Sequence, residues 1–309
     1  MAETSDCHAN APAPIDTAAW LTPVLAGLFI IGYTAGSIFV RSVPIAARFD
    51  PVRTQYDLWA AVVGSLCGYA LSAALYFGCA VVEIARIGAR VRMAPLAVAC
   101  AAVLLALVAV FAVFSIAEAH RPPSTDSRLA SQTWQISIGV AICASPGLLG
   151  FLMVRMIAVD NESWMEDGFC RMRLVMRVRM ELRRLLNVLG AFLTLIVIAT
   201  GLRRRALLSL DPHAALPSDA VLLYGLVFAV LIALFFISAS SALDVRAAQI
   251  VDEFAPLPQP DVPELSEALS RRNDLAALVG LGGSWRTFQA VVVVAAPLLT
   301  ALIASATGT

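Results

Sequence analysis

The side chains best suited to chemistry in this 309-residue chain are two histidines that lie close to carboxylates. Each belongs to a carboxylate-x-His pair beside an apolar stretch. Imidazole and carboxylate groups can hold zinc or act as an acid and a base. The spacing matches no zinc-ligand pattern, so solvated loop residues are the favoured interpretation. A metal site is the alternative, and its candidate ligands are Glu118, His120, Asp211 and His213.

Motifs for other chemistry are absent from the sequence. It contains no G-x-x-x-x-G-K-[ST] loop for phosphates, no G-x-S-x-G nucleophile turn and no H-E-x-x-H zinc motif. The 6 cysteines form no C-x-x-C pair, which argues against a disulfide framework or a zinc cluster. We therefore predict no catalytic residue and no cofactor.

The composition indicates what kind of structure must position these residues. Hydrophobic residues make up 60% of the chain and charged residues only 14%, whereas soluble domains average about 25% charged. The mean hydropathy is +0.81. Formal net charge is zero, so no overall field attracts nucleic acid. We expect the lipid bilayer as a partner and no nucleic-acid partner.

Seven uncharged apolar stretches are candidates for membrane spans. A helix needs about 20 apolar residues to cross about 30 Å of hydrocarbon, and it satisfies its own backbone hydrogen bonds there. The sequence therefore predicts an all-α polytopic bundle of about seven spans. Pro297 makes a re-entrant hairpin the alternative for the last stretch. The predicted spans are residues 20–40, 58–82, 94–117, 134–154, 185–202, 220–243 and 287 to about 305.

The remaining segments complete the predicted organisation. Residues 1–19 are expected to be a disordered tail, without the positive charge that a cleavable signal peptide needs. Residues 20–243 form the bundle. Residues 244–286 form a linker in which four prolines between 256 and 263 exclude a helix, followed by a short helix from Glu264. Residues 287–309 form the seventh span and the C-terminus.

The distribution of arginine predicts the orientation. The chain has 22 basic residues, all of them Arg, and alternate connections divide them into 14 on one side and 8 on the other. Cytoplasmic loops carry the excess of positive charge. The N-terminus is therefore predicted to be cytoplasmic, and the protein to lie in a bacterial inner (plasma) membrane.

An amphipathic helix is predicted to precede the fifth span and to continue into it. Leu174, Val178, Leu182, Leu185 and Leu189 recur at helical spacing. The favoured interpretation is a stripe facing the core with an ordinary positive flank, and a lipid-sensing or dimerising helix is the alternative. The basic face that would meet anionic headgroups comprises Arg173, Arg177 and Arg184.

Small residues at intervals of four indicate close helix packing in the first two spans. Such faces let two helix backbones approach and gain van der Waals contact. Packing within one bundle is the favoured interpretation, and contact with a second copy or another membrane protein is the alternative. The residues are Gly32, Gly36, Ala60, Gly64, Gly68 and Ser72.

The expected function follows from what the spans lack. No Asp, Glu, Arg or His lies within them, whereas ion-coupled transporters usually place ionisable groups at membrane depth. We expect a non-enzymatic structural, sensory or partner-binding membrane component. The first alternative is a transporter or channel for a small or lipophilic solute, which a cavity reaching the membrane midplane would favour. The second is an enzyme acting on lipid headgroups, which would require His120 and His213 to converge.

Overall fold

The chain is helical throughout the part that its structure, a computed structural model, describes. This part comprises residues 17–42, 50–87, 93–119, 127–160, 168–210, 218–256 and 265–281, with Ala295 and Leu299. Over these residues the chain forms seven α-helices and no strand, which confirms the all-α prediction there. The helices are α1 (Thr17–Arg41), α2 (Asp50–Ile87), α3 (Met93–Ala119), α4 (Ser127–Val159), α5 (Gly168–Leu210), α6 (Ser218–Phe254) and α7 (Leu265–Val279).

Five helices are long and apolar enough to cross a membrane, namely α1, α2, α4, α5 and α6. In α3 the apolar stretch Leu96–Ala109 is shorter. The predicted seventh span lies outside the described residues apart from Ala295 and Leu299. Of the predicted N-terminal tail, residues 1–16 lie outside them too, whereas α1 already begins at Thr17. These long apolar helices therefore support the prediction of a membrane protein.

The helices continue well beyond the apolar stretches from which spans were predicted. At 1.5 Å per residue, the 43 residues of α5 extend about 65 Å and the 37 residues of α6 about 55 Å, against about 30 Å of hydrocarbon. No helix breaker occurs between Asp244 and Phe254, and Ala247, Ile250 and Val251 are buried there. The helix α6 therefore occupies the first part of the predicted linker.

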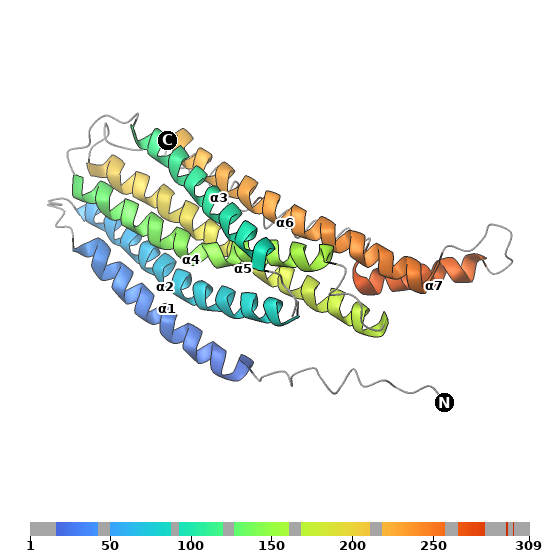
Figure 1. The fold of residues 1–309 in the computed structure, drawn as a ribbon. Coiled ribbons are helices and arrows are strands. Elements are labelled where there is room, and N and C mark those ends of the chain that lie inside the picture. The colour runs from blue at the N-terminus through green and yellow to red at the C-terminus, as the bar shows by residue number, and fades with distance from the viewer. Residues whose placement is uncertain are drawn as a thin grey trace.

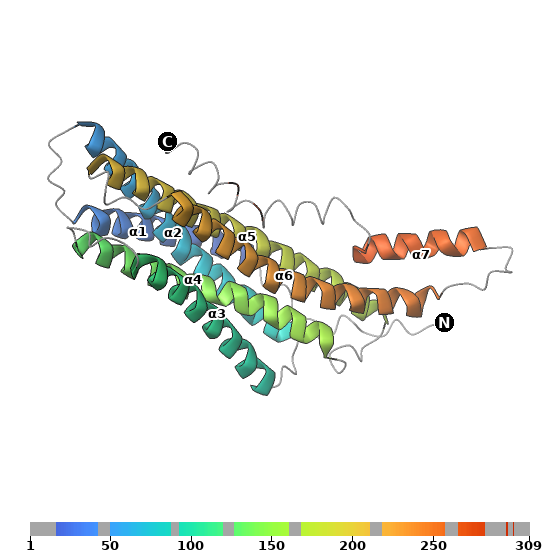
Figure 2. The same cartoon turned by 90° about the horizontal axis from the view of Figure 1, so that it is seen from above.

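The described helix after the prolines is short and has a clear end. It is α7, which begins at Leu265 and is followed by Gly280. Gly280 has φ of 85°, a left-handed conformation that glycine adopts without steric cost at a helix C-terminus. The helix lies alongside the end of α6 (Figure 2) and also contacts α5.

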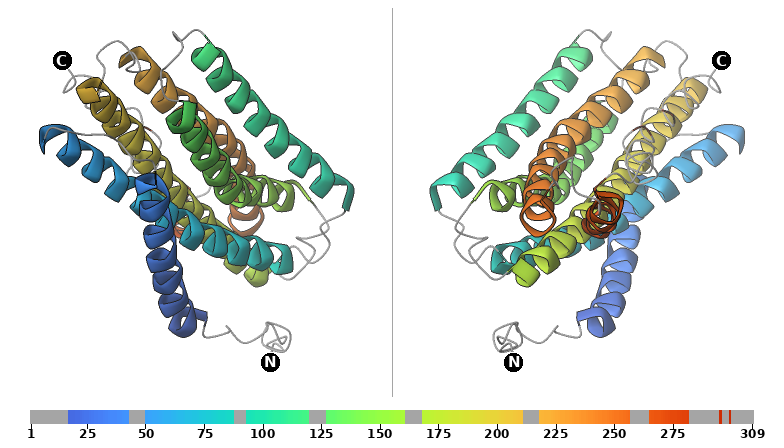
Figure 3. Two further views of the ribbon diagram at one scale, coloured as in Figure 1. Left: turned by 90° about the vertical axis from the view of Figure 1, so that its left-hand side faces the viewer. Right: turned by 90° about the vertical axis from the view of Figure 1, so that its right-hand side faces the viewer.

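The long helices pack side by side with their axes roughly aligned (Figure 1): α2, α4 and α6 run in one direction, and α1 and α5 run in the other. The central helix is α2, which packs against α1, α4 and α5, and α6 packs against α4 and α5. In contrast, α3 contacts mainly α4 and lies on the opposite flank from α1 (Figure 3). We call the end at which α5 finishes and α4 and α6 begin the Arg203 end, and the opposite end the α7 end.

Candidate functional site

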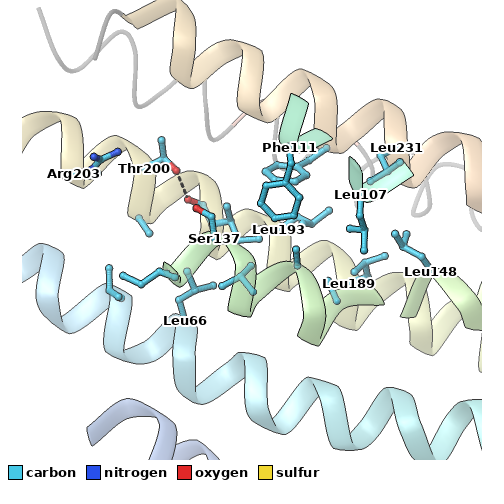
Figure 4. A pocket seen from close by; sticks show the side chains of 18 of the residues that line it. Leu66, Leu107, Phe111, Ser137, Leu148, Leu189, Leu193, Thr200, Arg203 and Leu231 are labelled. Carbon is cyan, nitrogen blue, oxygen red and sulfur yellow. Dashed lines mark hydrogen bonds between the residues drawn. The ribbon is translucent and has the colours of Figure 1, made fainter. Parts of the chain in front are cut away.

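An apolar cavity of about 110 Å³ lies between five of the helices. Its walls include Trp59 of α2, Phe111 of α3, Ala144 of α4, Leu193 of α5 and Leu231 of α6. Figure 4 shows side chains from different helices pointing into this space. Because residues distant in sequence converge here, the cavity is the main candidate for a binding site.

One face of α5 runs along the cavity. Leu189, Leu193, Ile196, Thr200 and Arg203 all line it, at spacings of four, three, four and three residues. Residues at such spacings share one face of a helix. From Leu189 to Arg203 the helix rises about 21 Å. The lining therefore extends along much of the predicted fifth span.

The two ends of the cavity differ in polarity. Arg203, Thr200 and Ser137 lie together at one end, and the Thr200 and Ser137 side chains point toward one another (Figure 4). The Thr200 hydroxyl also donates a hydrogen bond to the carbonyl oxygen of Ile196 at 2.8 Å. Arg203 is only 6% exposed, and among the described lining residues it is the one ionisable side chain. The opposite end is lined by leucines, including Leu148 and Leu231.

The helix α3 forms the outer wall of the cavity. Leu107 and Phe111 face inward, and the Phe111 ring meets Trp134 edge to face, with centroids 5.3 Å apart. Leu105, which lies two residues before Leu107 and therefore on the opposite face, is exposed. Since α3 packs mainly against α4, it is the least anchored of the helices that line the cavity.

The lining is suited to binding and not to acid–base catalysis. Among the described lining residues there is no carboxylate, imidazole or thiol that could form an acid and base pair with a neighbour. A water molecule occupies about 30 Å³ in the liquid, and an engineered apolar cavity of about 150 Å³ stays dry and binds benzene. A cavity of 110 Å³ thus has room for a small apolar group.

The small residues predicted to pack helices lie between α1 and α2. A Cβ on Gly32 would stand 2.7 Å from the Cys67 carbonyl oxygen and 2.7 Å from the Gly68 Cα. A Cβ on Gly36 would stand 2.8 Å from the Cys67 sulfur, and one on Gly64 2.9 Å from a backbone oxygen of α1. These contacts are within one chain. They bring the backbones of α1 and α2 together.

Hydrogen bonds reinforce the same interface. The Ser72 hydroxyl donates to the carbonyl oxygen of Leu25 at 2.9 Å, and the Tyr56 hydroxyl donates to that of Val40 at 2.5 Å. Ala60 is fully buried. Together these contacts connect α2 to both ends of α1.

The predicted basic face of α5 lies at the α7 end, away from the cavity. Arg177 forms an ion pair with Glu83 of α2, and Arg184 pairs with Glu181 at 2.7 Å, whereas Arg173 is exposed. The apolar stripe on this helix packs inward, since Val178 and Leu182 are buried. Two of the three arginines therefore have carboxylate partners within the chain.

Further ion pairs hold α5, α6 and α7 together at the α7 end. Arg171 makes a two-pronged contact with Glu253, at 2.7 and 2.8 Å, and Arg179 pairs with Asp244. Arg272 of α7 pairs with Asp252. The sequence argument used these arginines only as a sign of orientation. The acids follow in reverse order along α6, as antiparallel pairing with α5 requires, and this reversed order is a signal that could have revealed the pairs.

The candidate metal ligands are not brought together in the described part of the chain. Glu118 lies in the last turn of α3, and His120, Asp211 and His213 fall outside the described residues. Within those residues, no three His, Cys, Asp or Glu side chains are close enough to hold a metal ion. The metal site remains a prediction from sequence.

The cysteines depart from the expectation in one place. Cys170, near the start of α5, is disulfide-bonded, so the argument from spacing against disulfides is wrong for this residue. Cys67, Cys79, Cys100 and Cys143 are free thiols.

Sequence reasoning missed the position of Arg203 in the cavity wall. The tract Arg203-Arg204-Arg205 follows the predicted fifth span directly and was interpreted as loop charge, whereas α5 continues to Leu210. The apolar periodicity of α5, extended past Leu202, places Arg203 on the lining face and was the available signal. In comparisons with known proteins, no family model, curated protein or solved structure matches this chain. The cavity must therefore be interpreted from its own geometry.

Proposed function

We propose that this chain is a membrane-embedded binding protein for a small lipophilic solute, acting as a transporter or channel for it. The cavity between α2, α3, α4, α5 and α6 is the observation that carries the proposal. The proposed setting is a bacterial inner membrane, crossed about seven times, with the N-terminus in the cytoplasm. Five long apolar helices and the arginine distribution support this setting.

The position of the cavity suits a solute that partitions into lipid. Leu193, near the middle of the proposed fifth span, lines the cavity, so the space extends from about the midplane toward the Arg203 end. The walls contain mostly aliphatic and aromatic side chains. The free energy of transfer of an apolar solute from water to such walls is favourable by about 25 cal/mol per Å² of apolar surface buried.

A partner-binding or sensory role is the second candidate, and the α7 end supports it. There α5 and α6 continue beyond the length needed to cross a bilayer, and ion pairs hold them to one another and to α7. Leu278 of α7 is exposed by 56%. Because α5 lines the cavity and also reaches this end, one rigid helix connects the two. The third candidate, an enzyme acting on lipid headgroups, rests on His120 and His213 alone.

Binding of hexanol, a neutral lipophilic probe, tests the proposal. We expect saturable binding to the full chain in nanodiscs of zwitterionic lipid, measured by isothermal titration calorimetry against empty nanodiscs. Ala144→Phe places an aromatic ring in the cavity, because Ala144 lines it and is 7% exposed. This variant should lower hexanol affinity at least tenfold.

The matched control is Ala191→Phe, which adds the same ring on an exposed face of α5. It should bind hexanol as the unmodified chain does. Absence of saturable binding to the unmodified chain, or equal binding by Ala144→Phe, would contradict the proposed function.

A further inference from the structure

We infer that Arg86 of α2 and Arg173 of α5 bind the headgroup of an anionic phospholipid on the outer surface of the bundle. The inference goes beyond the proposed function, because it concerns a second ligand at a different place and does not depend on the cavity. It is carried by the register of α2 against α5, by two exposed arginines without a carboxylate partner among the described residues, and by the apolar side chains next to them.

Two contacts define the register of α2 against α5. The Tyr69 hydroxyl donates a hydrogen bond to the Val188 carbonyl oxygen at 3.2 Å, and Glu83 forms an ion pair with Arg177. Residue numbers rise from 69 to 83 along α2 while they fall from 188 to 177 along α5, so these two helices are antiparallel. The end of α2 therefore lies beside the beginning of α5, at the α7 end.

Arg86 and Arg173 lie at the same level on this helix pair. Arg86 follows Glu83 by three residues, and Arg173 precedes Arg177 by four. Residues at these spacings share one face of a helix. Because the helices are antiparallel, both steps lead in the same direction, by about 4.5 Å and about 6 Å. The two arginines therefore lie just beyond the Glu83–Arg177 ion pair, one on each helix.

Neither of these two arginines has a partner within the described part of the chain. Both side chains are exposed, and no ion pair or hydrogen bond joins either of them to a described residue. The neighbouring Glu83 already pairs with Arg177. Around this ion pair, three arginines accompany one carboxylate, which leaves a local excess of positive charge. A guanidinium group binds phosphate oxygens through paired N–H donors, so this excess is suited to a phosphate group.

The depth of the two arginines agrees with a lipid phosphate. Arg86 lies four residues, or about 6 Å, beyond Val82, where the predicted second span ends. The hydrocarbon of a bilayer is about 30 Å thick and the whole bilayer about 40–45 Å, so each headgroup layer is about 5–8 Å thick. In the proposed topology, Arg86 therefore lies in this layer, and Arg173 lies there with it.

Exposed apolar side chains lie on the same helix faces, toward the membrane. Val82 precedes Arg86 by four residues and is 50% exposed, and Met180 follows Arg173 by seven residues and is 52% exposed. Each helix thus has a cation at the headgroup level and an apolar side chain below it. A phospholipid has the same order, with its phosphate at the surface and its acyl chains toward the midplane. A soluble anion would contact the arginines alone.

The positive charge selects among the occupants of this surface. A zwitterionic headgroup brings its own cation, which the arginines repel, whereas an anionic headgroup is attracted by basic residues at this level. A second copy of the chain, related by a two-fold axis at this face, would bring the same arginines toward each other. Like charges placed together oppose such a contact. An anionic phospholipid is therefore the occupant that the surface fits.

Competition between two phospholipids with the same acyl chains tests the inference. The full chain in detergent is mixed with equal amounts of phosphatidylglycerol, which is anionic, and phosphatidylcholine, which is zwitterionic, and the bound lipids are counted by native mass spectrometry. We expect phosphatidylglycerol to bind the unmodified chain at least tenfold more tightly. The double variant Arg86→Gln/Arg173→Gln should reduce this preference to threefold or less.

The matched control is Arg41→Gln/Arg271→Gln, which removes two exposed arginines that already have carboxylate partners. It changes the net charge equally and should keep the preference for phosphatidylglycerol. Equal binding of both lipids by the unmodified chain would overturn the inference. So would a preference that survives in Arg86→Gln/Arg173→Gln with native helical content by circular dichroism. An equal loss in the control would also overturn it, because net charge alone would then select the lipid.

A soluble phosphate ester separates the phospholipid from a free anion. Glycerol 3-phosphate carries the phosphate without acyl chains, and at equal concentration it should not displace phosphatidylglycerol. Displacement would overturn the assignment to a phospholipid. Hexanol should bind Arg86→Gln/Arg173→Gln as it binds the unmodified chain, because neither arginine lines the cavity. Failure of hexanol binding therefore contradicts the proposed function, and loss of the lipid preference in the unmodified chain contradicts this inference.

Discussion

Two buried arginines occupy different environments on α5. Arg203 is 6% exposed and lines the apolar cavity, whereas Arg179 is 8% exposed and pairs with Asp244 of α6. The side chain of Asp244 is 49% exposed. Arg203 forms part of the cavity wall, whereas Arg179 makes a contact between two helices. The same residue type therefore has different surroundings at the two ends of α5.

Loss of the Arg179 partner should destabilise the α7 end. Asp244→Asn leaves a buried guanidinium opposite a neutral amide, and removing one member of a charge-assisted hydrogen bond costs about 1.5–3 kcal/mol. Because half of the Asp244 side chain is exposed to solvent, which screens the pair, we expect a loss near or below the lower end of this range, about 1–2 kcal/mol. The free energy of unfolding is measured by SDS titration with circular dichroism.

The control for this prediction is Glu267→Gln, which removes an exposed pair with Arg271 on the surface of α7. Exposed pairs at this spacing contribute about 0.3–0.5 kcal/mol. A loss for Asp244→Asn no larger than that for Glu267→Gln would show that the buried arginine does not depend on Asp244.

Single residues were the level at which the sequence was least informative. The residue types that line the cavity are ordinary for a membrane helix. Trp59, Ala144 and Leu231 become neighbours only because five helices converge there. Arg203 was assigned to a loop because hydropathy ends a span at the first charge, although hydrogen bonding lets a helix continue past it. The partners of Arg177 and Arg179 are distant in sequence and lie on other helices.

At the scale of the elements, α1 and α2 form the closest helix pair. Gly32 meets the backbone of α2, with no side chain between them that could rotate away. Gly27, on the same helix, has nothing within 4 Å of an added Cβ. Gly32 therefore lies at the contact with α2, whereas Gly27 of the same helix does not.

Gly32→Ala should weaken the contact between α1 and α2. Its Cβ would lie 2.7 Å from the Cys67 oxygen, so the helices must separate, and overpacking of this kind typically costs about 1–3 kcal/mol. We expect a loss of this size in the SDS titration. Gly27→Ala should leave stability unchanged or raise it slightly, because alanine favours a helix by about 1 kcal/mol over glycine. Equal effects of the two substitutions would contradict the close packing.

The existence and type of the elements were accessible from sequence, and their lengths were not. Apolar stretches predict where a helix crosses the bilayer, whereas a helix ends only where a breaker or an unfavourable contact ends it. Thus α6 continues to Phe254, just before Pro256, and α5 continues to Leu210 although its predicted span ends at Leu202. The residues beyond the span are stabilised by packing and ion pairs between helices.

The whole molecule combines a cavity in one half with an ion-paired helical extension in the other. Exposed apolar side chains cover the outer faces, among them Ile30, Leu105 and Leu234. Such a surface is suited to acyl chains, because large exposed apolar areas are rare on soluble monomers. The proposed orientation, based on the arginine distribution, has the α7 end in the cytoplasm. The disulfide at Cys170 is the observation that speaks against this orientation, since disulfides persist in oxidising compartments.

Cysteine labelling from the two sides of the membrane tests the account most directly. Ser42 follows α1 at the Arg203 end, Ser266 begins α7 at the opposite end, and both are exposed. Each is changed to cysteine in a chain whose Cys7 and Cys170 are serine, and cells are treated with a membrane-impermeant maleimide before or after permeabilisation. We expect Ser42→Cys to react in intact cells and Ser266→Cys only after permeabilisation, because in the proposed topology α2 to α6 each cross the bilayer between the two positions. A reversed pattern would contradict the orientation, and reaction of both from the same side would contradict the bundle that spans the membrane.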